Sequence, residues 1–213
     1  MKSSKNLIEQ LKTLPYFSKK TIYQLGKQFG LRNATMDAYI SRFLKRKEII
    51  QLKKGLYVAA DFFNKNKGNI SYSFYLANVL RTPSYVSSWA ALQYYNVTTE
   101  SIYTINSVTP KVTRTYKTKA GTFAYQSIKK ELFSDFSLVK RDPASPTDTF
   151  DFFIASPAKA LFDVLYFKTH QFRGVRFEDV DPLVEDMRID TGEMAKKDRA
   201  AFYTMIKKHL HYE

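Results

Sequence analysis

Residues 32–54 contain side chains that could form hydrogen bonds with the base edges and phosphates of a nucleic acid. Arg42 can bond both acceptors of a guanine, whereas hydroxyl groups reach bases or phosphates and lysines pair with phosphates. Asp37, on the same predicted helix face, would repel phosphate unless it pairs with an arginine or accepts a hydrogen bond from a cytosine amine. We predict that double-stranded DNA is contacted by Arg32, Asn33, Thr35, Ser41, Arg42, Lys45, Arg46, Lys53 and Lys54.

Three carboxylates, Asp148, Asp151 and Asp163, could instead gather around a divalent metal, as a metal-dependent nuclease or transferase requires. Their spacing favours a structural role. Asp148 and Asp151 flank a predicted strand, and Asp163 follows Lys159 by one helical turn and can pair with it. We therefore predict no catalytic residue, no metal and no cofactor, and the metal-dependent enzyme remains an alternative.

Other kinds of catalysis have less support in the sequence. The absence of Cys excludes disulfides, thiol catalysis and thiol-based zinc sites. His209 and His211 cannot lie on the same face of a helix, and neither forms a recognisable pair with a serine. The seven glycines are scattered singly, so no phosphate-binding loop is predicted.

A second basic group lies on predicted strands further along the chain, with aromatic residues between the charges. Such strands can form a platform on which single-stranded bases stack, so an RNA-binding module is a further alternative. Buried aromatics beneath a solvated basic face are the more common arrangement. The group comprises Lys111, Arg114, Lys117, Lys119, Lys129 and Lys130, interleaved with Tyr116, Phe123 and Tyr125.

The charge is distributed unevenly along the chain. Residues 1–68 carry fifteen Lys and Arg against four Asp and Glu, whereas the other 145 residues carry nineteen against sixteen. This asymmetry predicts a polyanionic partner for the N-terminal third. No segment resembles a signal peptide or an apolar membrane span, so we expect a soluble cytoplasmic protein without a membrane partner.

The elements that would position the DNA-contacting residues can be predicted from apolar spacing. Three helices are expected in residues 1–46: one that stops before Pro15, one that Ser18 caps and Gly30 ends, and one that Asn33 caps. Residues 48–59 alternate as two strands with a basic turn at 53–55. This order predicts a winged helix-turn-helix over residues 1–63. The inward face of the third helix would carry Met36, Ile40, Phe43 and Leu44.

Beyond a polar linker at 64–71, residues 72–213 are predicted to form an α+β domain. A serine at 87 or 88 would cap a helix that buries Trp89 and Leu92, and Ser156 with Pro157 would begin another. Further helices are expected at 72–80 and 193–210. A small, mainly antiparallel sheet would contain residues 102–108, 114–119, 123–128 and 149–155.

Three stretches are similar in sequence, order and separation to the motifs of a known family. They are ISRFLKRKEII with KKGLYV at 40–50 and 53–58, TPSYVSSWAALQYY at 82–95, and SPAKALFDVLY at 156–166. By these motifs the chain resembles the AbiEi antitoxins of bacterial abortive-infection, or type IV toxin–antitoxin, systems. The last two stretches are the more specific. Ala158 stands where the family usually has Glu, which removes a favourable charge from a helix start.

The resemblance implies a non-enzymatic DNA-binding antitoxin that acts in phage defence. Its winged helix would repress its own operon at an operator with inverted repeats. Its second domain would antagonise a nucleotidyltransferase-like toxin without forming a stable complex.

Overall fold

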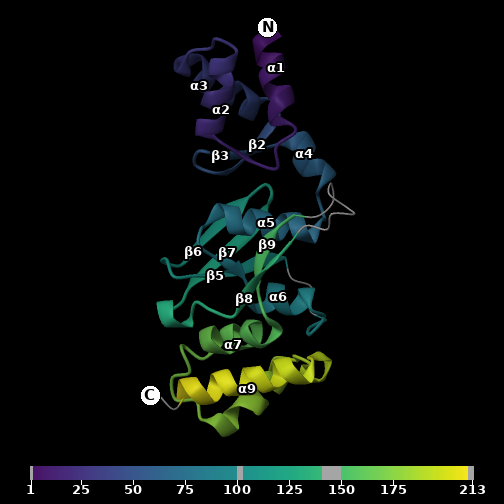
Figure 1. Cartoon of the computed structure of the whole chain (residues 1–213), viewed down its shortest axis with the longest axis vertical. Coiled ribbons are helices and arrows are strands. Elements are labelled where there is room, and N and C mark those ends of the chain that lie inside the picture. The colour runs from purple at the N-terminus through teal and green to yellow at the C-terminus, as the bar shows by residue number, and fades with distance from the viewer. Residues whose placement is uncertain (1, 100–102, 141–149, 211–213) are drawn as a thin grey trace. The chain divides into compact units, whose positions relative to one another are not determined.

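The computed structural model describes residues 2–99, 103–140 and 150–210, and Figure 1 labels its elements. The chain divides into two compact units, residues 1–69 with 116–122 and residues 70–115 with 123–213. Helices and strands occur in both units, so the predicted α+β class is confirmed. No helix within the described ranges is long and apolar enough to cross a bilayer.

Three helices form most of the first unit: α1 (Lys2–Leu11), α2 (Lys19–Gln28) and α3 (Asn33–Lys45). Their apolar residues recur every three or four positions, so each helix turns one face towards a shared core. Gly26 allows α2 and α3 to approach closely, because a Cβ at this position would lie 2.2 Å from Sδ of Met36. The core includes Leu7, Leu11, Ile22, Met36, Ile40 and Phe43.

The ends of these helices test the predicted caps. Ser18 caps α2 as expected: its Oγ accepts a hydrogen bond from the amide of Thr21 at 3.1 Å, and its own amide donates to Oγ1 of Thr21 at 3.3 Å. Gly30 follows α2 with φ +69°, the left-handed conformation that glycine adopts readily. The prediction that Asn33 caps α3 is wrong, because Arg32 occupies the cap position and Asn33 is the first helical residue.

The Ser18 cap gives a prediction for stability. Ser18→Ala should lower the free energy of unfolding by about 1 kcal/mol, because the amide of Thr21 loses its acceptor. Urea denaturation followed by circular dichroism measures this change. Ser41→Ala is the control, since the exposed Ser41 hydroxyl has no hydrogen bond within the described ranges, and it should change stability by less than about 0.5 kcal/mol. Equal urea midpoints for Ser18→Ala and Ser41→Ala would contradict the capping role of Ser18.

A three-stranded antiparallel sheet, in the order β1-β3-β2, completes the first unit. The predicted hairpin is formed by β2 (Ile49–Lys53) and β3 (Leu56–Ala59), and Gly55 turns the chain with φ +78°. Lys53 belongs to β2 and not to the turn. The third strand, β1 (Phe17–Ser18), was not predicted, because two residues show no periodicity.

Two helices extend into the segment that was predicted as a linker. α4 (Ala60–Lys65) follows β3 directly, and α5 (Ile70–Leu80) begins the second unit. Within residues 64–71, only residues 66–69 therefore lie outside helices.

A six-stranded sheet, in the order β6-β7-β5-β4-β9-β8, belongs to the second unit except for residues 116–122 of β6, β7 and the turn between them, which belong to the first unit. Strand β4 pairs antiparallel with β5 and parallel with β9, and β9 pairs antiparallel with β8, so the sheet is mixed. Strands β4 and β8 were not predicted, and residues 102 and 149 of the predicted strands lie outside the described residues. The strands are β4 (Tyr85–Val86), β5 (Thr104–Thr109), β6 (Arg114–Thr118), β7 (Gly121–Ser127), β8 (Phe136–Val139) and β9 (Phe152–Ala155).

Helices pack on this sheet and on one another, with α7 against both α6 and α9 (Figure 1). As predicted, Ser156 caps α7, and its Oγ accepts the amide of Lys159 at 3.2 Å. Leu92 is buried, but Trp89 is partly exposed, so its predicted burial is wrong. Besides α5, the helices are α6 (Ser88–Tyr94), α7 (Pro157–Lys168), α8 (Val180–Asp186) and α9 (Lys196–Leu210), with 3-10 turns at Lys130–Leu132, Phe177–Asp179 and Thr191–Glu193.

Candidate nucleic-acid interface

Helix α3 turns a polar, basic face to solvent because its opposite face is buried. Met36, Ile40 and Phe43 are at most 6% exposed. Positions on the other side of the helix, at the same three- and four-residue spacing, are all exposed, and these are Ala34, Ala38, Ser41, Arg42 and Lys45. The three polar side chains can donate hydrogen bonds to an external partner.

The start of α3 is open to an acceptor. Arg32 holds the cap position in an extended conformation, with φ −80° and ψ 154°, and its side chain makes no capping hydrogen bond. The first amides of the helix therefore lack a side-chain cap. Arg32 and Asn33 are both exposed beside these amides. Such a helix start attracts phosphate oxygens through the amides, the helix dipole and the adjacent cation together.

Asp37 does not oppose an anionic ligand, because α2 neutralises it. Its Oδ1 lies 2.8 Å from Nζ of Lys19 and accepts a hydrogen bond from the Tyr23 hydroxyl at 2.7 Å. The Lys19 ammonium and the Tyr23 hydroxyl hold the pKa of Asp37 below its usual value, and Asp37 in turn raises the pKa of Lys19. Both groups stay charged at neutral pH, so the pair adds no net negative charge to the face. The sequence had suggested an arginine or a cytosine amine as the partner of Asp37, but the partner is a lysine.

The exposed side chain of Arg42 packs on a neighbouring aromatic ring. Its guanidinium lies over the ring of Tyr39, 4.9 Å from the centroid, which orders the side chain without using its N–H groups. Within the described ranges Arg42 forms no ion pair, and neither do Lys45 and Arg46, which are exposed at the end of α3. These three side chains can therefore bond an external anion or base.

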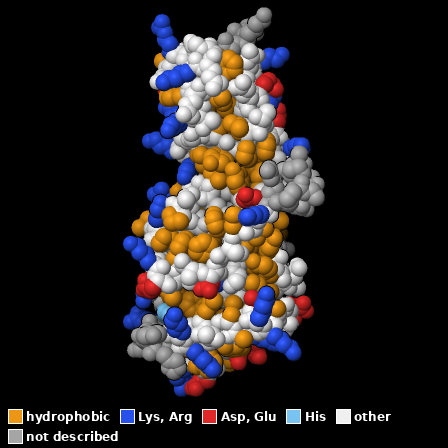
Figure 2. Space-filling model, viewed as in Figure 1, with side chains coloured by type: hydrophobic (Ala, Val, Ile, Leu, Met, Phe, Trp, Pro, Cys, Tyr) orange, Lys and Arg blue, Asp and Glu red, His pale blue; other side chains and the backbone are white. Residues whose placement is uncertain are grey.

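The hairpin tip is tied to the body of the first unit. The amide of Lys19 donates to the carbonyl of Gly55 at 2.9 Å, which joins the tip to the start of α2. Lys54 is exposed, whereas Lys53 is partly buried, as is Thr35 on α3. Of the nine residues predicted to contact DNA, Thr35 and Lys53 are the least accessible. Figure 2 shows Lys and Arg side chains standing out from the part of the chain that carries α1–α3.

Two of the three aromatic residues interleaved with the second basic group are buried, and Tyr116 is partly exposed. Phe123 and Tyr125 are 1% exposed and belong to the core, and the Tyr125 hydroxyl donates to the carbonyl of Ala77 at 2.6 Å. Lys111 donates to the carbonyl of Thr82 at 2.6 Å. The other members are exposed but come from separate elements: Arg114 and Lys117 from β6, Lys119 from the turn after it, and Lys129 and Lys130 from the segment after β7.

The three carboxylates of the alternative metal site do not form one in the described residues. Asp163 is fully buried, Asp151 is exposed, and Asp148 lies outside the described residues. Within the described ranges no group of three or more His, Asp or Glu is arranged to hold a metal. The predicted pairing of Asp163 with Lys159 is confirmed, at 2.6 Å between Oδ1 and Nζ.

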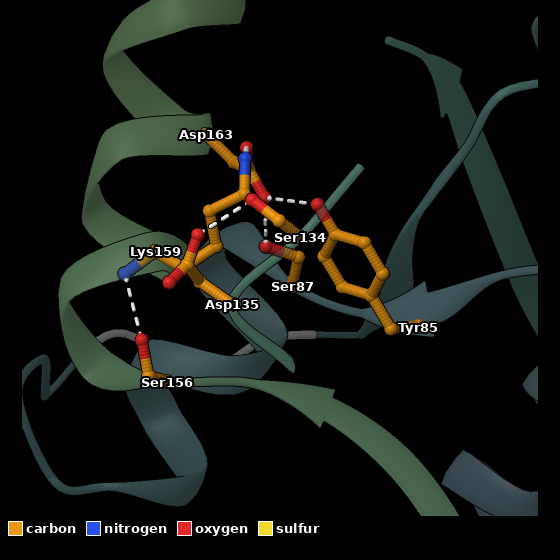
Figure 3. Close-up of polar contacts among 7 residues, drawn as sticks. All are labelled: Tyr85, Ser87, Ser134, Asp135, Ser156, Lys159 and Asp163. Carbon is orange, nitrogen blue, oxygen red and sulfur yellow. Dashed lines mark hydrogen bonds and ion pairs between the residues drawn. The ribbon is translucent and has the colours of Figure 1, made fainter. Parts of the chain in front are cut away.

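Asp163 lies at the centre of a buried polar network (Figure 3). Besides Lys159, it accepts hydrogen bonds from the hydroxyl of Ser87 at 2.6 Å and from that of Tyr85 at 3.2 Å. Burial raises the pKa of Asp163, and the charge of Lys159 opposes this shift. Burial also raises the pKa of Tyr85, with the charge of Asp163 as a second cause. Sequence reasoning missed Tyr85 and Ser87, which lie 78 and 76 residues from Asp163.

This network joins the two more specific motifs of the sequence. Tyr85 and Ser87 belong to residues 82–95, and Lys159 and Asp163 belong to residues 156–166. Comparison of the whole chain with family models and with curated proteins finds no match. The resemblance therefore depends on the motifs themselves, and the geometry gives these two motifs a shared structural role.

Proposed function

We propose that this chain is a DNA-binding transcriptional regulator and that residues 1–63 form a winged helix-turn-helix. α3 is the recognition helix, and the β2–β3 hairpin is the wing. The order of elements supports this assignment. The three helices and the hairpin share one core, and the short strand β1 joins the hairpin in one sheet. In such domains the last helix enters the major groove, and the wing contacts the adjacent backbone.

The observation that carries the proposal is the chemistry of the outward face of α3. Ser41, Arg42 and Lys45 are exposed there, and the only acidic residue of the helix is held by Lys19. Arg42 suits a guanine edge, and Lys45 suits a phosphate. Lys54 at the hairpin tip adds a second phosphate contact from the same unit.

We further propose that the chain is an AbiEi-type antitoxin, which represses its own operon at inverted repeats in the cytoplasm. The second unit antagonises a nucleotidyltransferase-like toxin without a stable complex. The motifs at 82–95 and 156–166 support this role, because they carry the more specific part of the resemblance and residues of both surround Asp163.

The dependence of binding on salt tests the DNA-binding part of the proposal. Fluorescence anisotropy with a duplex from the region upstream of the chain's own gene should show affinity falling linearly with salt on logarithmic axes. If six to ten phosphates are contacted, the loss between about 50 and 200 mM salt is on the order of 10³–10⁵-fold. An affinity that does not change with salt would contradict phosphate contact.

Co-expression with a nucleotidyltransferase-like toxin encoded beside the gene tests the antitoxin part. The wild-type chain should restore growth, and Arg42→Ala, Lys45→Ala should restore it equally, because antitoxicity belongs to the second unit. Gel filtration of the two proteins together should give separate peaks. Failure of the wild-type chain to restore growth would contradict the antitoxin role. It would not bear on the DNA-binding role, which the salt experiment tests separately.

A further inference from the structure

The second unit contains a pocket that the proposed function does not use. Its volume is about 620 Å³, within the range of small-molecule sites. Three segments form its walls: residues 129–135 between β7 and β8, the first half of α7 and residues 201–209 of α9. Ser134, Asp135 and Lys159 of the close-up in Figure 3 all line it.

One wall of the pocket is apolar and rich in rings. Phe162 of α7 and Met205 of α9 line it, together with the ring of His209. The His209 ring lies 5.8 Å from that of Phe162 and 5.3 Å from that of Phe172, and its buried Nε2 has no hydrogen-bond partner among the described residues. Such a wall suits a flat ring that stacks on it and accepts or donates a hydrogen bond.

Lys159 brings unused hydrogen-bond donors to this pocket. Its side chain is 2% exposed, and an ammonium has three N–H donors. Within the described ranges only Asp163 accepts one of them, and the ring of Phe162 lies 4.8 Å from Nζ. Burying an ammonium with incomplete hydrogen bonding costs free energy, so an acceptor entering the pocket would be bound well.

Charges of both signs surround the opening. Lys129 and Lys208 are exposed there and form no ion pair with any described residue. Glu131 and Asp135 line the same pocket. A ligand with negative charge alone would be attracted by the lysines but repelled by the two carboxylates. A ligand that combines an anionic group with N–H donors on a ring would satisfy both.

We propose that this pocket binds a nucleoside monophosphate. The phosphate bonds to the spare N–H groups of Lys159 and to Lys129 and Lys208. The base packs on Phe162 and Met205, and its amino group donates to Asp135 or Glu131. This site belongs to the second unit alone and does not depend on the DNA-binding proposal.

Calorimetric titration of the full chain tests the site with AMP, GMP, CMP and UMP, with the matching nucleosides and with inorganic phosphate. At least one nucleotide should bind saturably, and its nucleoside and inorganic phosphate should each bind about tenfold more weakly or worse, because each lacks half of the contacts. Lys129→Ala, Lys208→Ala should weaken the nucleotide by about tenfold or more.

The matched control is Lys130→Ala, Lys207→Ala, which removes the same charge from the neighbouring residues that do not line the pocket. Its affinity for the nucleotide should equal that of the wild type. The proposal is overturned if no nucleotide binds at millimolar concentration, if inorganic phosphate binds as tightly, or if both double variants weaken binding equally.

Discussion

Asp163→Ala should lower the free energy of unfolding of the second unit by about 3–5 kcal/mol, the usual cost of removing one partner of a buried ion pair. Asp163 is fully buried and Lys159 is 2% exposed, so the alanine variant leaves a buried ammonium without the one acceptor that it has among the described residues. The hydroxyls of Ser87 and Tyr85 lose their acceptor as well. Urea unfolding followed by fluorescence reports on this unit, because the single tryptophan of the chain is Trp89 in α6.

Three further variants separate charge burial from simple loss of a side chain. Asp186→Ala removes an exposed ion pair with Lys168 and should cost less than about 1 kcal/mol. Asp163→Asn keeps an acceptor for the hydroxyls of Ser87 and Tyr85. Its free energy of unfolding should lie between those of Asp163→Ala and Asp186→Ala. Lys159→Met with Asp163→Leu should recover part of the loss, since neither charge is left unpaired although the hydroxyls of Ser87 and Tyr85 still lack their acceptor. If Asp163→Ala cost no more than Asp186→Ala, the network would not hold the second unit together.

Arg42→Ala should weaken binding to the operator by about 1–3 kcal/mol and abolish the preference for one base pair. The reason is geometric, because the guanidinium lies over Tyr39 on the exposed face of α3 and forms no ion pair within the described ranges. Lys45→Ala should weaken all duplexes about equally, since a phosphate contact carries no sequence information. Anisotropy titrations against the operator and a series of single base-pair changes measure both effects. An Arg42→Ala protein with the wild-type preference would show that α3 does not read the bases in this way.

Local chemistry explains which parts of the fold were predictable. Ser18 caps α2, Gly30 ends it and Ser156 caps α7, because each of these signals acts within a few residues of itself. The pairing of Lys159 with Asp163 follows from helical spacing in the same way. The incorrect cap at Asn33 shows the limit of such signals, because Arg32 occupies the cap position of α3 in spite of its poorer capping side chain.

The features that the sequence did not predict depend on contacts between distant segments. Strands β1 and β4 have two residues each and exist because longer strands pair with them. Tyr85 and Ser87 become partners of Asp163 only when residues 85–87 lie against α7. Trp89 was expected on the buried side of its helix, but large side chains are often buried only in part.

The elements that carry the candidate DNA-contacting residues could be predicted from the sequence, whereas the contacts around those residues could not, and their role in DNA binding stays a prediction. All nine residues lie in or beside α3 and the hairpin, and most of them are exposed. The role of Asp37 could not be predicted, because its partners Lys19 and Tyr23 lie on another helix whose rotation depends on packing. Their pairing removes the one charge that opposed the hypothesis.

A comparison of two double variants tests the central claim most directly. The first double variant is Arg42→Ala, Lys45→Ala, and both of its positions lie on α3. The second, a control, is Lys5→Ala, Lys65→Ala, and its positions lie outside α3. Each variant removes two positive charges from exposed positions of the first unit. In anisotropy titrations of the full chain with its upstream duplex at about 0.15 M salt, the α3 variant should lose at least about a hundredfold in affinity. The control should lose about tenfold or less, as expected for general electrostatic attraction. Equal losses for the two variants would contradict DNA recognition by the outward face of α3.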